Sequence, residues 1–203
     1  SDTLGFSMRV DAINNRRPSG ATENTVFGPF HVDGVPIRQM GDNICLDGKG
    51  ESCVYEGRVI DRDGKPIEGA TVDVWSDNAD GYYDVQQPDI QPKFNNRGRF
   101  ITGADGVYRF VGIKPVSYPI PDDGPVGKML TALGRHPNRP AHLHFLVTAP
   151  GYQKIVTHIF DGEDEWLSSD AVFGVKQSLI APFEPADGDT EWHAHFDFVM
   201  VKA

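Results

Sequence analysis

The sequence is poor in cysteine and in basic residues, and it has no long hydrophobic run. Its two cysteines, Cys45 and Cys53, favour free thiols over a disulfide framework, because a chain of 203 residues can bury a core that needs no cross-link. Nineteen Lys and Arg against 29 Asp and Glu give a net charge of −10, which argues against a nucleic-acid partner. No apolar run approaches the roughly 20 residues that span a bilayer. The opening SDTLGFSMRVD also lacks the basic and apolar regions of a signal peptide, so we expect a cytoplasmic protein.

Glycine and proline, in contrast, are frequent along the whole chain, with 22 and 15 copies. They separate short runs of β-branched and aromatic residues, a pattern typical of an all-β sandwich or barrel. The expected strands are residues 52–61, 71–77, two within 98–113 around a turn at 104–106, 141–152, 154–160 and 192–201. Residues 84–96 are polar and interrupted by proline, so they predict a long loop of the kind that often carries function.

Two short helices are expected outside the strands. Leu4, Met8 and Ile13 recur at helical spacing before Pro18, and a second helix is expected between Pro125 and Gly134. The sequence therefore predicts a mainly β protein, a β-sandwich with a short N-terminal helix and peripheral loops. We expect residues 1–20 to form the helical region and residues 21–203 to form the sandwich domain.

A pair of histidines stands out in RPAHLHF, residues 139–145. His142 and His144 lie two residues apart in an expected strand, so their side chains face the same way. His193 and His195 in EWHAHFDF have the same spacing, and there the apolar neighbours leave the histidines on a solvated side. Spacing alone therefore leaves open whether the first pair binds a metal or is structural.

Tyrosines in two upstream loops bear on this choice. They are Tyr82 and Tyr83 in NADGYYDVQ and Tyr118 in KPVSYPIPDDGP, where flanking prolines stiffen the backbone. Each could be an ordinary boundary residue with a buried ring and a wet hydroxyl. Phenol has a pKa of about 10, but a trivalent metal ion can hold it ionised at neutral pH. Hard phenolate oxygens suit ferric iron better than zinc or a ferrous site with two histidines and a carboxylate.

At the level of whole blocks, the chain resembles the intradiol ring-cleavage dioxygenases, the non-haem ferric enzymes that split catechols between their two hydroxyls. The resemblance covers nearly the whole chain and rests on the order and spacing of five blocks: NTVFGPFHVDGVP, GKPIEGATVDVWSDNADGYYD, GVYRFVGIKPVSYPIPDDGPVG, GRHPNRPAHLHF and SSDAVFGVK. Within the family, YDVQQPDIQPKFNNRGRF and SDAVFGVK are similar to the hydroxyquinol branch, with the chlorocatechol and catechol branches next.

The resemblance implies a non-haem Fe(III) cofactor, O2 as co-substrate and a set of site residues. The metal ligands would be Tyr83, Tyr118, His142 and His144, with Tyr83 preferred over Tyr82 because it stands two residues after the glycine of its loop. Catalytic roles would fall to Tyr118, which leaves the metal when substrate binds, to Arg139 and to His158, which stands where catechol-type members carry glutamine. The residues expected to contact substrate are Asp2, Phe27, Gly28, Pro121, Arg139, His158 and Val172.

The same resemblance implies an activity and a partner. We expect cleavage of hydroxyquinol to maleylacetate, or alternatively of catechol or chlorocatechol to a muconate. SDTLGFSM resembles a stretch inside the helical dimerisation region of the family, so a homodimer is expected where that region is complete.

Two rival functions remain at this point. GRVIDRDGKPIEGATVDVW also resembles transthyretin-like modules, which bind partners without catalysis. A ferrous extradiol or cupin-type oxygenase would instead need a carboxylate beside the two histidines.

Overall fold

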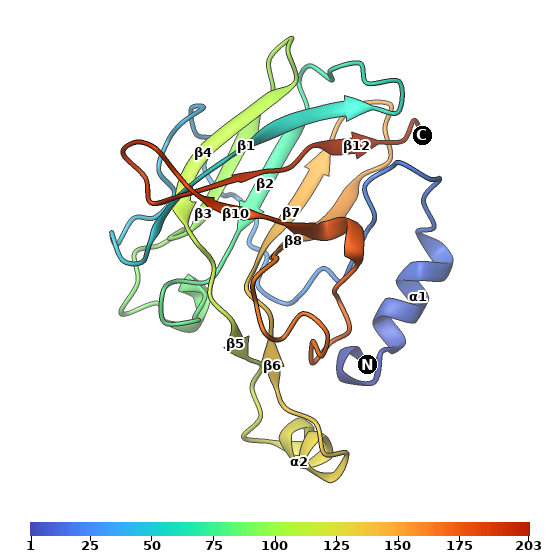
Figure 1. The fold of residues 1–203 in the computed structure, drawn as a ribbon, viewed down its shortest axis with the longest axis vertical. Helices are drawn as coiled ribbons and strands as arrows, with labels where there is room; N and C mark the ends of the chain where they lie inside the picture. Colours follow the sequence, from blue (N-terminus) through green and yellow to red (C-terminus); the bar gives the residue numbers. More distant parts are fainter.

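Two β-sheets packed face to face form the body of the computed structural model, which describes all residues 1–203 (Figure 1). In the first sheet, β4 pairs antiparallel with β1, β11 and β12 pair parallel with β1, and β10 lies beside β11. The strands of this sheet are β1 (Ser52–Asp61), β4 (Val107–Ile113), β10 (Phe183–Pro185), β11 (Trp192–His195) and β12 (Phe198–Met200). The second sheet has the order β3-β2-β7-β8-β9, with bounds Arg97–Ile101, Thr71–Trp75, His142–Thr148, Ile155–Asp161 and Ile180–Ala181. The predicted mainly β sandwich is confirmed.

The core fills the space between the sheets. Every second residue of β7 points into it, so that Leu143, Phe145 and Val147 are at most 1% exposed. Aromatic rings from the first sheet pack against them, with the Phe110 and Phe145 ring centroids 6.4 Å apart. Burial of this apolar surface, at about 25 cal/mol per Å2, is what holds the two sheets together.

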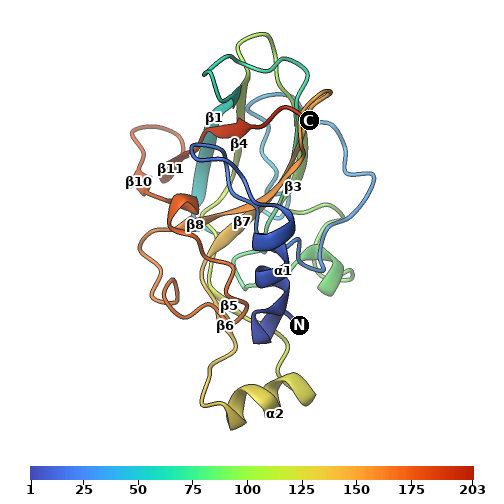
Figure 2. The ribbon, with the colours of Figure 1, turned by 90° about the vertical axis from the view of Figure 1, so that its right-hand side faces the viewer.

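The helices and a small two-stranded arm lie outside the sandwich (Figure 2). The arm consists of β5 (Tyr118–Pro119) and β6 (Asn138–Arg139), and α2 (Pro125–Ala132) forms its tip. The predicted N-terminal helix is α1 (Phe6–Asn14), in which only Met8 is buried. Short 3-10 helices occupy Asp2–Leu4, Asp84–Gln86 and Gln177–Leu179. No helix has the length and hydropathy required to cross a membrane.

The predicted strands 71–77 and 141–152 were too long, since they end at Trp75 and Thr148, and the predicted strand 192–201 was wrong in its continuity. Residues 192–201 form two strands, β11 and β12, because the backbone leaves the ladder at Phe196 and Asp197. The Phe196 carbonyl accepts a hydrogen bond from the Tyr108 hydroxyl at 2.7 Å, and the Asp197 carboxylate accepts one from the Arg58 backbone N–H at 2.8 Å. These contacts with neighbouring strands compensate for the interrupted pairing.

This interruption requires a glycine on β1. A Cβ added at Gly57 would lie 1.9 Å from the Phe196 carbonyl oxygen, a backbone atom that cannot move aside without breaking the strand pairing. We therefore expect Gly57→Ala to lower the free energy of unfolding by about 2 kcal/mol or more, and the Tm by about 5 °C. Gly124→Ala is the matched control, because an added Cβ there meets nothing within 4 Å. Equal Tm values for the two variants would contradict the tight contact.

Candidate functional site

The outer face of the second sheet carries the histidine pair. Alternation along β7 sends Leu143 into the core and directs His142 and His144 to the opposite side, where both are nevertheless only 1% exposed. Strand register adds two more rings, since Trp75 of β2 and His158 of β8 both stand opposite His144. The two histidine side chains point to the same side of the sheet, as predicted, and other segments cover that side.

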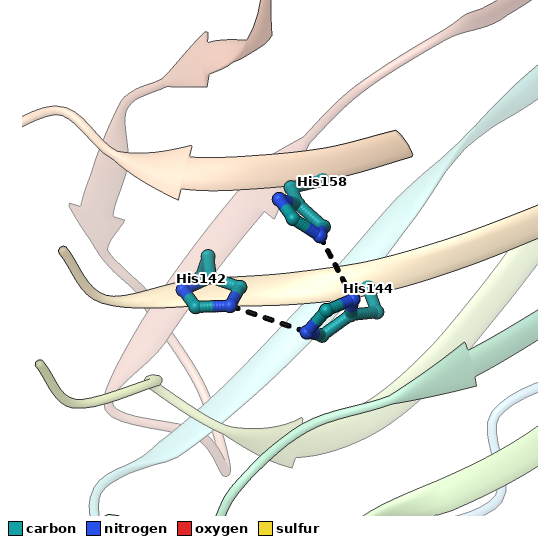
Figure 3. Close-up of side chains that lie close together, drawn as sticks. All are labelled: His142, His144 and His158. Atoms are coloured by element: carbon teal, nitrogen blue, oxygen red, sulfur yellow. Dashed lines mark hydrogen bonds between the residues drawn. The ribbon is translucent and has the colours of Figure 1, made fainter. Parts of the chain in front are cut away.

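His144 is enclosed on several sides. Its ring stacks on Trp75 with centroids 4.9 Å apart and planes 15° apart, and its Nδ1 lies 2.8 Å from His158 Nε2 (Figure 3). Gly28 covers it from outside, because a Cβ on Gly28 would lie 2.9 Å from His144 Cε1. Gly28 also has a φ of 75°, which a side chain would strain. The backbone around residue 28 can approach the ring only because glycine stands there.

The hydrogen bonds of His142 define its protonation. Its Nδ1 donates to the Pro140 carbonyl at 2.6 Å, and its Nε2 accepts from the Arg139 Nη1 at 3.0 Å. A guanidinium can only donate, so Nε2 carries a lone pair. That atom lies 3.2 Å from His144 Nε2 (Figure 3). Two imidazole nitrogens therefore converge on one point.

The two predicted tyrosine ligands meet the histidines from separate loops. Tyr83 is fully buried and stacks on Phe30 at 4.3 Å, whereas Tyr82 beside it is 46% exposed. The β5–β6 ladder pairs Tyr118 with Arg139. The hydroxyls of Tyr83 and Tyr118 lie 3.4 Å apart.

All four predicted metal ligands thus belong to one buried cluster. The Tyr118 ring centroid lies 5.6 Å from that of His142, and the Tyr83 centroid lies 6.0 Å from that of His144.

Burial sets the charges of this cluster. It lowers the pKa values of His142, His144 and His158 well below 6.5; Arg139 adds to the effect at all three, and neighbouring histidines add to it at His144 and His158. It also raises the pKa values of Tyr83 and Tyr118, so the phenols and imidazoles are neutral. For Arg139, burial opposes the charged form, but Tyr118 and Asp170 outweigh it and the pKa is raised. Arg139 is consequently the one cationic group of the cluster.

The donor set fits ferric iron. Two imidazole nitrogens and two phenol oxygens converge, and a trivalent cation would favour the ionised phenolates that burial alone disfavours. Among His, Cys, Asp and Glu side chains, the group close enough to share a metal ion is His142, His144 and His158, without any carboxylate. A ferrous site of two histidines and a carboxylate therefore has no carboxylate to use.

A cleft of about 440 Å3 opens beside the cluster. Its lining includes five of the residues predicted to contact substrate, together with one predicted metal ligand: Asp2, Gly28, Pro121, Arg139, Val172 and Tyr118. The other two predicted residues lie elsewhere. Phe27 is 42% exposed and packs on Trp75, with centroids 5.6 Å apart. His158 is fully buried against His144 and does not line the cleft.

Sequence reasoning missed Asp170. Its carboxylate accepts a hydrogen bond from the Arg139 Nε at 3.2 Å and from the backbone N–H groups of Val172 and Gly174, at 3.2 and 2.8 Å. It therefore orients the arginine and shapes the loop that carries Val172. The only signal in the sequence was an acidic residue two positions before Val172.

Comparison with known proteins agrees with this geometry. A family model described as Dioxygenase matches residues 27–202. Hydroxyquinol 1,2-dioxygenase of Rhizobium sp. (strain MTP-10005) is 55% identical over 100% of this chain and 72% of its own length. The chain belongs to the intradiol ring-cleavage dioxygenases. Another member, 6-chlorohydroxyquinol 1,2-dioxygenase of Cupriavidus pinatubonensis, is 50% identical over 98% of this chain and 72% of its own. Among solved intradiol dioxygenases, hydroxyquinol 1,2-dioxygenase from Pseudomonas putida DLL-E4 superposes with a TM-score of 0.95 at 48% identity, covering 100% of this chain and 74% of that one. The predicted family is confirmed.

The buried histidines make stability depend on pH. Their folded pKa values lie well below the ordinary 6.5, so below pH 6.5 the unfolded chain binds protons that the folded chain excludes. Stability is therefore complete above pH 6.5 and is lost as the pH falls, by up to about 1.4 kcal/mol per pH unit for each histidine. Urea unfolding of iron-free protein between pH 7.5 and 5.5 measures this slope.

His158→Gln should remove about one histidine's share of the slope. His193→Gln serves as the control, because this side chain is 32% exposed and lies outside the buried cluster. An unchanged slope in His158→Gln would show that His158 does not exclude a proton in the folded state.

Proposed function

We propose that the protein cleaves hydroxyquinol between its adjacent hydroxyls, using O2 at a ferric centre and giving maleylacetate. The observation that carries this proposal is the buried set of two tyrosines and two histidines, which stands beside Arg139 at the edge of a cleft. The substrate is supported by the relatives described above, which are named for hydroxyquinol or its 6-chloro derivative. Catechol and chlorocatechol are the alternative substrates.

Tyr83, Tyr118, His142 and His144 would hold the iron. Ferric iron bound there supplies Lewis acidity, favouring ionised phenols and ionised substrate hydroxyls and preparing the ring for reaction with O2. His142 already presents an unprotonated Nε2. For His144 to do the same, its Nδ1 must carry the proton and donate it to His158 Nε2, 2.8 Å away. His158 therefore acts through His144 in this proposal, as a partner that selects the tautomer.

The two tyrosines have different access to substrate. Tyr118 lines the cleft, whereas Tyr83 is fully buried and does not. Burial raises the pKa of Tyr118, which favours its neutral phenol when it is not a ligand. Tyr118 Oη is thus the atom suited to take up a proton from the incoming substrate, and Tyr83 is suited to remain a permanent ligand.

Arg139 and Asp2 lie along the same cleft and would contact different parts of the ring. Arg139 is cationic and is held by Asp170, so it would stabilise negative charge that develops on the ring. One carboxylate oxygen of Asp2 accepts hydrogen bonds from the Ser1 and Ser7 hydroxyls. The other would accept one from the third hydroxyl of hydroxyquinol, which catechol lacks.

The rival functions explain less of the structure. A transthyretin-like binding module accounts for the sandwich but has no use for a buried tyrosine and histidine cluster beside a cleft. A ferrous oxygenase would need a carboxylate ligand, and none lies among the histidines.

The homodimer stays a prediction, as does the division of the chain at residue 20. Phe6, Val10 and Ile13 of α1, which are 53–64% exposed, are the apolar surface that such a dimer would use.

The adjacent tyrosines provide a matched test of the metal ligands. Tyr83→Phe should reduce iron content and shift or abolish the visible tyrosinate-to-iron absorption, with activity falling at least about 100-fold because a ligand is lost. Tyr82→Phe should change none of these by more than about twofold, since Tyr82 is 46% exposed. Iron analysis, a visible spectrum and oxygen uptake measure the three effects. A Tyr83→Phe variant that keeps its colour and turnover would show that Tyr83 is not a ligand.

The substrate is tested by comparing kcat/KM for hydroxyquinol, catechol and 4-chlorocatechol. We expect hydroxyquinol to be preferred by about tenfold or more, because one satisfied hydrogen bond to a charged group is worth about 1.5–3 kcal/mol. Product analysis should show maleylacetate. A preference for catechol would contradict the proposed substrate but not the proposed ring-cleavage chemistry. Absence of cleavage of all three compounds would contradict the proposed function.

A further inference from the structure

We propose that Arg135 is a positioning residue for substrate selectivity: it joins the N-terminal turn that carries Asp2 to the loop that carries Val172. The two segments, residues 1–5 and 170–174, are far apart in the sequence and lie side by side in the structure (Figures 1 and 2). Both contribute to the lining of the cleft. The proposal rests on the proposed function for the identity of what the cleft binds.

Arg135 contacts both segments with a single planar group. Its Nη1 donates to the Thr3 carbonyl, and its Nη2 donates to the Ala171 carbonyl at 3.0 Å. Thr3 follows Asp2 directly and Ala171 precedes Val172 directly. Each hydrogen bond therefore fixes the backbone next to a residue that lines the cleft.

An aromatic ring strengthens the same junction. The Arg135 guanidinium carbon lies 4.3 Å from the Phe173 ring centroid, a cation–π geometry. The same ring abuts the N-terminal turn, because a Cβ on Gly5 would lie 3.4 Å from Phe173 Cδ2. Phe173 has a φ of 58°, uncommon for a bulky residue, so the surrounding contacts must hold it in this conformation.

The loop that Arg135 contacts also binds Arg139, the arginine beside the proposed metal ligands. Asp170, at the start of the loop, binds Arg139 and accepts hydrogen bonds from the backbone N–H groups of Val172 and Gly174. The end of the cleft at Arg139 is therefore fixed by Asp170, whereas Arg135 helps to fix the position of Asp2 relative to it, together with the packing of Met8 on Val172. The hydrogen bonds of the Asp2 side chain reach only Ser1 and, in α1, Ser7. Loss of the junction should weaken recognition at the Asp2 end and spare the reacting end.

The test compares hydroxyquinol with catechol in Arg135→Gln, Arg135→Lys and a control, Arg109→Gln. Arg109 lies on β4 in the other sheet, is 57% exposed and pairs only with Glu56. In Arg135→Gln the ratio of kcat/KM for hydroxyquinol to that for catechol should fall about tenfold, mainly through KM for hydroxyquinol. Arg135→Lys should also lose most of the preference for hydroxyquinol, because one ammonium group cannot reproduce the two hydrogen bonds that the planar guanidinium donates. Iron content and the visible spectrum should match those of the wild type in all three.

A double-mutant cycle with Asp2→Ala separates positioning from general damage. If Arg135 acts through Asp2, Arg135→Gln should change the ratio by less than about twofold in the Asp2→Ala background. Additive effects, equal losses for both substrates, or an unchanged ratio in Arg135→Gln or Arg135→Lys would overturn the proposal. Should Arg135→Gln fail to fold, Phe173→Leu replaces it, with a smaller fall of the ratio expected and an unchanged ratio counting against the proposal. A wild type that cleaves neither substrate overturns the proposed function, whereas an active wild type with a ratio insensitive to Arg135 overturns only this inference.

Discussion

The alternation of side chains along β7 is the constraint on which the rest of the molecule depends. One strand supplies Leu143, Phe145 and Val147 to the core and, from the positions between them, His142 and His144 to the opposite face. An outer sheet face normally meets water, yet these histidines are 1% exposed. Remote segments must therefore cover them, and the glycine at position 28 and the two tyrosine loops do so. A shift of β7 by one residue would therefore change the core and the site together.

The charge balance of the covered cluster is equally constrained. Neutral imidazoles and phenols surround the single ion pair of Arg139 with Asp170, so the cluster as a whole is close to neutral. A trivalent cation is compatible with such an interior only if phenol protons leave as it binds. Because no carboxylate lies among the histidines, the tyrosines are the groups that could supply compensating negative charge as ligands.

Much of this arrangement was predictable from sequence, and the limits have physical causes. Period-two alternation located the strands and the shared side of His142 and His144, and the family blocks distinguished Tyr83 from Tyr82. The interruption at Phe196 and Asp197 was not predictable, because Tyr108 and Arg58, which compensate for it, lie on other strands. Asp170 and Arg135 were missed for a similar reason: their partners are side chains and carbonyls of distant loops, and such contacts leave no local periodicity.

Two of the short connections of the sandwich join strands of different sheets, whereas β7–β8 and β10–β11 are paired within one sheet. β1 and β2 are consecutive but unpaired, as are β3 and β4, so the turns after Asp61 and Ile101 are corners and do not form hairpins. The pairing of β1 with β11 and β12 joins segments distant along the chain, which lengthens the search during folding. Tyr83, Tyr118 and His144 lie in three segments that are separate along the chain and meet in the folded protein. A metal site built from these side chains would therefore be assembled by the fold as a whole, because no single segment carries more than two of the four proposed ligands.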